Sequence, residues 1–237
     1  MSSKRLAGRI ALVTGASRGL GRAIALSFAA EGATVIAYAR TQKDLESLDD
    51  EIRKISGSPA VLVAESLTDY AKIDQTAAAI FQRYKKLDIL VGNAGVFTQL
   101  SPMGHFTPKM WDDVMAVNLT ANWRLIRAFD PLLRQSDAGR AIFVTSGVAR
   151  LDEMYWGPYG VSKAGLERMV KIYAAEIAHT KVRVNLLDPG TVRTAMRARV
   201  RPGEDPMTVR PPESIMPYIL DLADPACTKN GELILAR

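Results

Sequence analysis

The sequence has few of the features that define secreted, membrane-spanning and metal-binding proteins. It contains one cysteine, Cys227, which excludes a disulfide framework within one chain and is typical of a reducing compartment, so we expect a cytoplasmic protein. No run of about 18 apolar residues occurs, and the first residues form no secretory signal, so we expect no membrane association. Two isolated histidines, His105 and His179, make no metal-ligand pattern with the cysteine, and no metal is expected.

Positive charge exceeds negative charge without forming a nucleic-acid motif. The formal net charge is +6, but the basic residues are dispersed along the chain, so no nucleic-acid partner is expected. One concentration of arginines stands out late in the chain, and it consists of Arg193, Arg197, Arg199, Arg201 and Arg210. A solvated basic loop and a positive field that steers an anionic substrate explain this concentration equally well.

Nothing in the composition divides the chain into separate units. Hydrophobic residues make up 48% and charged residues 24% of the sequence, as in ordinary globular domains, and no linker-like stretch interrupts them. We therefore expect one domain over residues 1–237. No G-x-S-x-G motif occurs and neither histidine belongs to a motif, which argues against a serine hydrolase.

Short apolar runs alternate with amphipathic segments through the whole chain. The predicted strands are 9–14, 33–38, 60–64, 87–91, 141–145, 181–187 and 232–235. The predicted helices are 20–31, 41–55, 69–84, 108–134, 159–178 and 213–222. Thr41 and Thr107 are the expected N-caps of two of them, with Pro108 in the first turn. Residues 191–212 are polar and rich in arginine and proline, and we expect a loop with a short helix that covers the substrate.

The alternation predicts an α/β fold, namely a Rossmann-like, doubly wound parallel sheet of about seven strands with helices on both faces. In such sheets, ligands bind beyond the carboxyl ends of the strands. A glycine-rich turn, Asn93, Ser146 and the pair Pro189-Gly190 all follow predicted strands directly. We therefore expect these residues to share one edge of the sheet.

The glycine-rich turn between the first strand and the first helix is suited to a phosphate ligand. Residues 15–21 read GASRGLG, with the spacing G-x-x-x-G-x-G. Glycines at such a turn let backbone N–H groups approach a pyrophosphate, and the N-terminus of the following helix favours its negative charge. A glycine-rich turn without a ligand is the alternative, which the surrounding strand–helix–strand pattern makes the weaker one.

Three polar residues near the fifth predicted strand suit proton transfer to or from a carbonyl oxygen. Tyr159 and Lys163 are four residues apart and should share one face of a helix, and Ser146 ends the strand before them. A nearby ammonium favours the ionised phenol and lowers its pKa, while a serine hydroxyl holds the carbonyl oxygen. Taken alone, the Tyr-x-x-x-Lys spacing favours a half-buried tyrosine with a solvated lysine, and the rest of the chain shifts the balance toward the catalytic interpretation.

With these motifs in place, the chain resembles the short-chain dehydrogenase/reductase family over essentially its whole length, in particular bacterial NADP-dependent carbonyl and ketoacyl reductases. Residues 14–21 are similar to the family's T-G-x-x-x-G-x-G, residues 92–95 to its N-N-A-G, and residues 189–194 to its P-G-x-x-x-T. The resemblance implies a catalytic tetrad of Asn118, Ser146, Tyr159 and Lys163. It implies cofactor binding by Gly15, Ser17, Arg18, Gly19, Leu20, Gly21, Arg40, Asn93, Ala94, Gly95, Tyr159, Lys163, Pro189, Gly190, Val192 and Thr194.

The resemblance also assigns a role to each member of the tetrad. Tyr159 is the expected general acid for ketone reduction and base for alcohol oxidation, and Lys163 is expected to lower its pKa and to hold the nicotinamide ribose. Ser146 would orient the carbonyl, and Asn118 would keep a water in a proton relay. The chain departs from the family pattern at Ser66, where an Asp often binds adenine, at Gly92 in place of Asn, and at its last residues, which lack the usual Asp-Gly-Gly.

The end of the second predicted strand favours NADP(H) over NAD(H). An NAD-specific protein needs a carboxylate there to bind the ribose hydroxyls, and this chain has Ala39 followed by Arg40. The guanidinium of Arg40 suits a phosphate, and Arg18 in the glycine-rich turn can approach the same 2′-phosphate. Two solvated surface arginines are the alternative explanation.

The predicted function is therefore an NADP(H)-dependent oxidoreductase that interconverts a small-molecule carbonyl and alcohol. The alternative is a catalytically weak NADP-binding sensor on the same fold; a nucleotide-sugar epimerase is disfavoured because the chain leaves little room for a substrate domain. Tyr155 and Trp156 are expected in the pocket wall, with surface packing as the alternative. The resemblance implies a homodimer or homotetramer, joined through the long helices of residues 118–134 and 159–178 and through the last strand.

Overall fold

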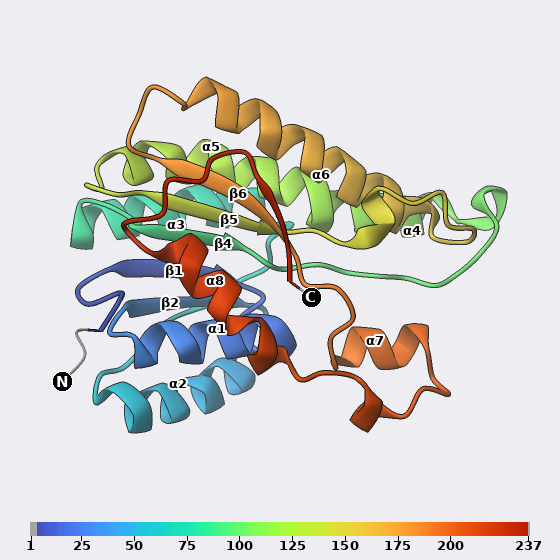
Figure 1. Ribbon diagram of the computed structural model, residues 1–237, viewed down its shortest axis with the longest axis horizontal. Helices are drawn as coiled ribbons and strands as arrows, with labels where there is room; N and C mark the ends of the chain where they lie inside the picture. Colours follow the sequence, from blue (N-terminus) through green and yellow to red (C-terminus); the bar gives the residue numbers. More distant parts are fainter. Residues whose placement is uncertain (1–3, 237) are drawn as a thin grey trace.

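The computed structural model describes residues 4–236, which build one seven-stranded parallel sheet (Figure 1). The strand order is β3-β2-β1-β4-β5-β6-β7, so the chain starts in the middle of the sheet and extends it first to one edge and then to the other. The strands are β1 Ile10–Thr14, β2 Thr34–Ala39, β3 Val61–Ala64, β4 Ile89–Gly92, β5 Arg140–Val144, β6 Arg183–Asp188 and β7 Leu233–Leu235. The predicted fold class and number of strands are confirmed.

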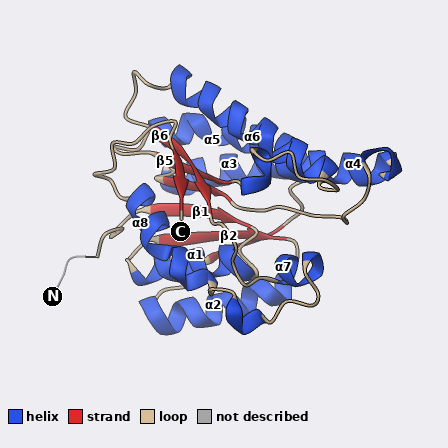
Figure 2. Ribbon diagram, turned by 45° about the vertical axis from the view of Figure 1, so that its right-hand side comes forward, coloured by secondary structure: helices blue, strands red, loops and turns tan. Residues whose placement is uncertain are grey.

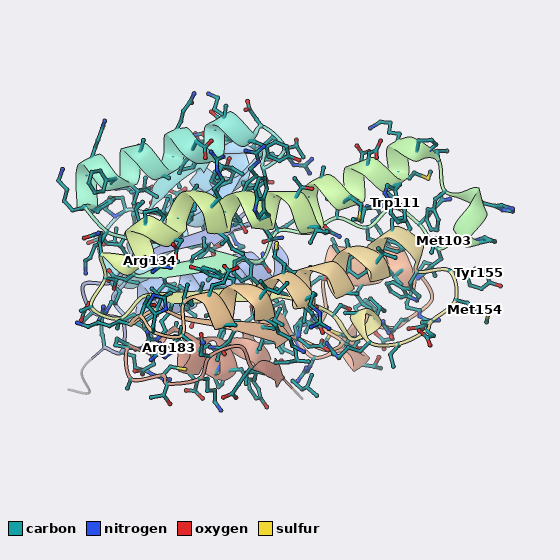
Figure 3. All side chains as sticks on the ribbon, turned by 90° about the horizontal axis from the view of Figure 1, so that it is seen from above. Met103, Trp111, Arg134, Met154, Tyr155 and Arg183 are labelled. Atoms are coloured by element: carbon teal, nitrogen blue, oxygen red, sulfur yellow. The ribbon has the colours of Figure 1, made fainter. Side chains whose placement is uncertain are left out.

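Helices cover both faces of the sheet (Figures 1 and 2). One face carries α1 Gly19–Ala30, α2 Gln42–Ser56 and α8 Met216–Ala223. The other carries α3 Tyr70–Tyr84, α5 Ala121–Arg134 and α6 Gly157–Glu176, which lie side by side in Figure 3. Two further helices, α4 Pro108–Met115 and α7 Ala195–Val200, project beyond one end of the sheet (Figure 1). Short helical turns complete the list: η1 Met103–His105, η2 Ala116–Thr120, η3 Gly147–Ala149, η4 Pro206–Thr208 and η5 Pro212–Ile215.

The sheet separates two hydrophobic cores, and alternate residues of one strand enter different cores. In β1, Ala11 and Val13 belong to the core beneath α1 and α8, whereas Ile10 and Leu12 belong to the core beneath α3, α5 and α6. This follows from the two-residue period of a strand. Because both faces are covered, the strand reads as a continuous apolar run rather than as an alternating one.

Local signals in the sequence predict the element boundaries only in part. Thr107 caps α4 as expected, since its hydroxyl accepts a bond of 3.3 Å from the backbone N–H of Met110. Thr41 is the N-cap residue of α2, as expected, although its side chain makes no capping bond. The long helical region that ends at Arg134 also contains a π-helical turn at Ala116–Thr120, which periodicity does not reveal.

Among residues 4–236, no helix is both long and apolar enough to cross a membrane. The same residues contain no group of three or more histidine, cysteine, aspartate or glutamate side chains placed to hold a metal ion.

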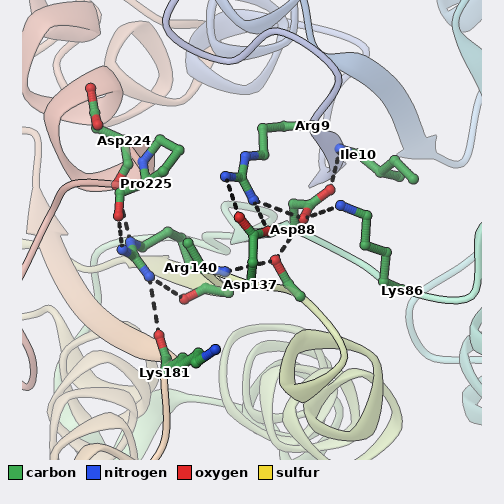
Figure 4. Close-up of polar contacts among 12 residues, drawn as sticks. Arg9, Ile10, Lys86, Asp88, Asp137, Arg140, Lys181, Asp224 and Pro225 are labelled. Carbon is green, nitrogen blue, oxygen red and sulfur yellow. Dashed lines mark hydrogen bonds and ion pairs between the residues drawn. The ribbon is translucent and has the colours of Figure 1, made fainter.

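A fully buried carboxylate, that of Asp88, joins the amino-terminal ends of the central strands (Figure 4). It accepts hydrogen bonds from the Ser136 hydroxyl at 2.6 Å, the backbone N–H of Ile10 at 2.9 Å, Lys86 Nζ at 2.9 Å and Arg9 Nη1 at 3.1 Å. Burial alone would raise the Asp88 pKa, but the hydrogen bonds from Ser136, Lys86 and Ile10 outweigh it and hold the pKa below its usual value. The ionised carboxylate therefore stabilises the fold.

Close by, the buried guanidinium of Arg140 ties the start of β5 to two later segments (Figure 4). It donates hydrogen bonds to the backbone carbonyls of Lys181 at 3.3 Å and of Asp224 at 3.1 Å, and also to that of Pro225. These contacts fasten the end of the sheet opposite to the site described below.

We predict that Asp88→Asn lowers the free energy of unfolding by about 3 kcal/mol at pH 7, because it leaves buried donors and two cations without their carboxylate. The Asp88 pKa is depressed in the folded state, so its contribution is complete above the unfolded pKa of about 4 and is lost as the pH falls through the folded pKa. Urea unfolding at pH 7 and at acidic pH measures both effects, and the difference between wild type and variant should shrink at low pH.

The matched control is Asp137→Asn, since the Asp137 side chain also binds Arg9 but is 67% exposed. It should cost less than about 1 kcal/mol. Equal losses in the two variants would contradict the role given to Asp88.

Candidate active site

The motifs singled out in the sequence meet at the carboxyl ends of β1, β4, β5 and β6. These strands end at Thr14, Gly92, Val144 and Asp188, and each runs directly into one of the motifs. In Figure 1 this edge of the sheet faces α4 and α7. The expectation that the motifs share one edge is therefore met.

The hydroxyl of Thr14 holds the glycine-rich turn against the loop after β4. It donates to the carbonyl of Val91 at 3.0 Å and accepts from the backbone N–H groups of Asn93 at 3.0 Å and Ala94 at 3.2 Å. Asn93 Nδ2 returns a bond of 2.9 Å to the Thr14 carbonyl. Thr14 occupies the first position of the glycine-rich motif, but the sequence gives no sign of the number of its partners.

Two glycines of this turn are required by close packing and backbone conformation. A Cβ atom on Gly21 would lie 2.2 Å from the carbonyl oxygen of Gly15, so no side chain fits there. Gly19 has a φ of +56° and a Cβ there would lie 3.5 Å from Cγ2 of Thr194, which places the segment 189–194 beside the turn. Neither glycine therefore places a side chain at the start of α1, which suits the close approach of a phosphate to this end of the helix.

The remaining residues proposed for the cofactor divide into core and surface positions. The side chains of Leu20 and Val192 are buried in the core beneath α1 and α8, so only their backbone can face a ligand. Thr194 caps α7 by accepting a 3.2 Å bond from Arg197 N. Six of the other residues are half-buried, namely Gly15, Ser17, Asn93, Ala94, Gly95 and Pro189. Three are exposed, namely Arg18, Arg40 and Gly190.

Lys163 is almost fully buried, at 3% exposure, beneath the loop that follows β4. Its Nζ donates to the carbonyl of Val144 at 2.8 Å. A Cβ on Gly95 would lie 3.7 Å from this Nζ and 3.6 Å from Asn118 Oδ1, so the loop passes directly over both side chains. Burial lowers the Lys163 pKa to about 8, and the charge of Glu167 opposes this effect.

Asn118 lies in the π-helical turn and is fully buried. Its amide accepts from Val96 N at 2.8 Å and donates to Val96 O at 3.0 Å and to Ser162 Oγ at 3.1 Å. These bonds fix the loop over Lys163 and connect it to α6. They use the side-chain amide of Asn118, and the role of this residue in a proton relay stays a prediction.

Tyr159 stands between Ser146 and Lys163, as the sequence pattern predicts. Its hydroxyl is hydrogen-bonded to the Ser146 side chain, and Lys163 Nζ lies 5.8 Å from the centre of its ring. The expected lowering of the Tyr159 pKa does not occur in the described chain. Burial of the hydroxyl raises the pKa to about 12, because it outweighs the hydrogen bond with Ser146, and the charge of Asp188 adds to the rise.

Two aromatic rings stand beside the Tyr159 ring. The centroids of Phe97 and Trp156 lie 5.9 Å and 5.8 Å from that of Tyr159, and 5.5 Å from each other. The role of Trp156 in a pocket wall stays a prediction, but its ring lies beside that of Tyr159. The side chain of Tyr155 instead lies at the outer end of the molecule with Met154 and Met103 (Figure 3), and it is half exposed.

Most arginines of the segment 191–212 have partners within the chain. Arg210 donates to the carbonyls of Pro189 at 2.5 Å and Thr191 at 3.3 Å, and to that of Ala236. Arg197 pairs with Glu204 through two bonds of 2.6 Å, and Arg193 contacts the sulfur of Met207 at 3.2 Å. Arg199 donates to the carbonyl of Thr98 at 3.2 Å, so the segment reaches the loop that follows β4. The position of the segment 191–212 supports the predicted covering role. Most of its arginines, however, are already bonded to other groups of the chain.

Arg18 and Arg40 differ from those arginines, because neither guanidinium has a hydrogen-bond or ion-pair partner within residues 4–236. Both are exposed: Arg18 directly precedes α1, and Arg40 directly follows β2. Ser66, after β3, accepts a hydrogen bond from the Tyr38 hydroxyl through its carbonyl at 3.3 Å, and its own hydroxyl pairs with Thr68 at 2.8 Å.

The glycine at position 92 is explained by its neighbours. A Cβ there would lie 2.4 Å from the Phe143 ring and 2.5 Å from Asn122 Oδ1, so these two side chains fill the space that a side chain at position 92 would need. Local packing thus accounts for a glycine at position 92, where the family motif has asparagine.

Comparison with known proteins agrees with this arrangement. A family model described as short chain dehydrogenase matches residues 9–205. The oxidoreductase YciK of Escherichia coli is 39% identical over 226 residues, covering 94% of this chain and 89% of YciK. The 3-oxoacyl-[acyl-carrier-protein] reductase FabG of Thermotoga maritima is 34% identical over 198 residues, covering 83% and 79%.

Solved structures give the same result over the whole chain. A short chain dehydrogenase of Shigella flexneri, complexed with NADP, superposes with a TM-score of 0.95 at 37% identity and 99% coverage of both chains. One from Escherichia coli CFT073, complexed with NADPH, superposes with a TM-score of 0.95 at 38% identity and 100% coverage of both chains.

Proposed function

The chain belongs to the short-chain dehydrogenase/reductase family of oxidoreductases, and we propose that it interconverts a carbonyl and an alcohol with NADP(H), using Tyr159 as general acid and base. The observation that carries this proposal is the meeting of Ser146, Tyr159 and Lys163 beside the glycine-rich turn at one edge of the sheet. Ser146 follows β5, whereas Tyr159 and Lys163 lie on α6, so the fold brings together residues from two elements.

The chain's residues fit a dinucleotide at this edge. The turn around Gly19 and Gly21 leaves the N-terminus of α1 open to phosphate, and Thr14 fixes the loop of Asn93 and Ala94 beside it. When bound, the nicotinamide cofactor supplies the hydride for reduction or accepts it for oxidation. Lys163 would hold the ribose next to the nicotinamide.

The proton chemistry is assigned to Tyr159. With a pKa of about 12, its phenol keeps its proton at neutral pH, which is the form that ketone reduction needs. Ser146, bonded to the same hydroxyl, would orient the carbonyl oxygen so that the proton moves from the Tyr159 oxygen to it. The positive charge of Lys163 would stabilise the phenolate left behind.

Two free arginines support the choice of NADP(H). Arg18 and Arg40 have no partner in the described chain, and Ala39 places no carboxylate between them and a 2′-phosphate. A planar guanidinium binds phosphate through paired hydrogen bonds, whereas the ribose hydroxyls of NAD(H) give it little to bind. Relatives solved with NADP and NADPH are consistent with this choice.

The aromatic wall indicates the kind of substrate. Phe97 and Trp156 stand next to the reacting phenol, so a ketone with an apolar or aromatic substituent would pack against them. Reductases named for a 3-oxoacyl group are among the relatives, and an acyl chain suits such a wall. An anionic group on the substrate has less support. Within residues 4–236 the guanidinium of Arg201 makes no hydrogen bond or ion pair, but its charge acts on the carboxyl of Glu204.

We predict that Tyr159→Phe lowers kcat at least about 100-fold in NADPH-dependent ketone reduction, because it removes the transferable proton and little else. The dissociation constant for NADPH, measured by fluorescence, should change less than about threefold. Tyr155→Phe is the control, since Tyr155 is half exposed and away from the site, and it should retain full activity. A Tyr159→Phe enzyme that turns over ketones at the wild-type rate would refute the mechanism, and a wild type without turnover on apolar, aryl and 3-oxoacyl ketones would favour a cofactor sensor.

We predict at least about tenfold higher kcat/KM with NADPH than with NADH, since two charge-assisted contacts to the 2′-phosphate exceed the 1.4 kcal/mol that a factor of ten requires. The double change Ala39→Asp with Arg40→Leu should abolish or invert this preference. Arg22→Leu is the matched control, because Arg22 lies on α1 nearby but pairs with Glu51 at 3.0 Å. Equal kcat/KM values for the two cofactors in the wild type would show that Arg18 and Arg40 do not read the phosphate.

We also propose a homo-oligomer joined through α5 and α6. Large apolar side chains stand exposed on these helices, with Trp123 at 46% and Ile172 at 52% exposure. We predict a dimeric or tetrameric mass by light scattering at micromolar concentration, and a shift toward monomer in Trp123→Glu with Ile172→Glu. Phe81→Glu on α3, where Phe81 is 49% exposed, should leave the mass unchanged. A monomeric wild type would refute the proposal.

A further inference from the structure

Three charged side chains meet behind the catalytic residues. Arg150, which follows η3, donates through Nη1 to Oε1 of Glu167 on α6 and through Nη2 to Oδ2 of Asp188 at the end of β6. The two carboxylates are nearly buried, with side chains 9% and 8% exposed, while that of Arg150 is 32% exposed. One arginine thus balances two buried negative charges.

Each carboxylate also holds a group that belongs to the site. The hydroxyl of Thr145 donates to Glu167 Oε1 at 2.9 Å, directly before Ser146 in the chain. The backbone N–H of Gly190 donates to Asp188 Oδ1 at 2.9 Å, within the loop that begins the segment 189–194. The cluster therefore connects the end of β5, the helix that carries Tyr159 and Lys163, and the loop after β6.

The two carboxylates of the cluster raise the pKa values of Lys163 and Tyr159. Glu167 follows Lys163 by one helical turn and raises its pKa against the effect of burial. Asp188 raises the Tyr159 pKa, in addition to the larger effect of burial. Arg210 also reaches the loop after β6, but it binds the carbonyls of Pro189 and Thr191 rather than either carboxylate.

We propose that Arg150 is a positioning residue: by bridging Glu167 and Asp188 it locks α6 to the loop after β6 and limits the negative charge felt by Lys163 and Tyr159. Its importance for turnover rests on the function proposed above; its effect on Lys163 does not. Without Arg150, the two buried carboxylates lose a positively charged partner. The pKa values of the cations and acids around them must then rise.

The direct test follows the titration of Lys163 by NMR in lysine-labelled protein, with the resonance assigned by its disappearance in Lys163→Met. The wild type should titrate near pH 8. We expect Arg150→Met to raise the midpoint by about 1 pH unit, because Glu167 then acts without its partner. Adding Glu167→Gln to Arg150→Met should bring the midpoint back to the wild-type value or below it.

Arg168→Met is the matched control, since Arg168 neighbours Glu167 in the chain but is exposed and has no partner within residues 4–236. Its midpoint should equal that of the wild type. A midpoint in Arg150→Met within about 0.2 units of the wild type would overturn the proposal, and so would an equal rise in the Arg168 variant.

Should Arg150→Met not fold, the triple variant Arg150→Met, Glu167→Gln, Asp188→Asn replaces the cluster by neutral groups of similar shape. Its Lys163 midpoint should fall below the wild-type value, and an unchanged or raised midpoint would overturn the proposal. In folded Arg150→Met, the acidic limb of kcat/KM against pH for alcohol oxidation should move to higher pH. A uniform loss of activity without that shift in the pH profile would mean that Arg150 has only a structural role. A wild type without turnover would refute the proposed function, and the Lys163 titration would then decide the role of Arg150.

Discussion

The hydrogen bonds of the Thr14 hydroxyl join β1 to β4 and to the loop after it, at the point where the order of the strands reverses. After β1 the chain passes to α1 on one face, and after β4 it passes to α4 and α5 toward the other (Figure 1). Adjacent strands whose connections diverge in this way leave a crevice between them, where ligands bind in open α/β sheets. Three hydrogen bonds from one side chain keep β1 and the loop after β4 in contact across that crevice. This contact holds the glycine-rich turn beside the loop after β4, and Asn118 binds the same loop further along, at Val96.

Burial determines the chemistry of the side chains gathered there. It raises the pKa of Tyr159 and lowers that of Lys163, so each group is shifted toward its neutral form. The paired carboxylates beyond them, held by Arg150, supply the opposite influence on the lysine. The site thus combines buried titratable side chains with a set of charges that begins one helical turn beyond Lys163.

Sequence patterns predict the architecture of this chain well and the electrostatics of its site poorly. Apolar periodicity locates all seven strands, and the spacing of Ser146, Tyr159 and Lys163 brings them to one place because helix and strand geometry act over a few residues. Local periodicity does not encode the π-helical turn around Asn118 or the partners of Arg197 and Arg210, because these depend on contacts between separate segments of the chain. Arg150 escaped notice for the same reason, since its partners lie 17 and 38 residues away. Periodicity also gives no sign that Thr41, the N-cap of α2, makes no side-chain capping bond. The direction of the Tyr159 pKa shift depends on how deeply the surrounding chain buries it, which no motif specifies.

The order of strands has a consequence for how this protein acquires its function during folding. β1 pairs with β2 after a short crossover, but the contact between Thr14 and Asn93 closes a loop of 79 residues. Contacts of such high sequence separation form late and slowly, because loop closure costs entropy before the contact returns any stability. The crevice therefore exists only in chains in which this contact has formed. Any molecule that occupies the crevice then selects completely folded chains and stabilises them by mass action, so the protein's lifetime in a cell becomes coupled to the supply of its own ligand.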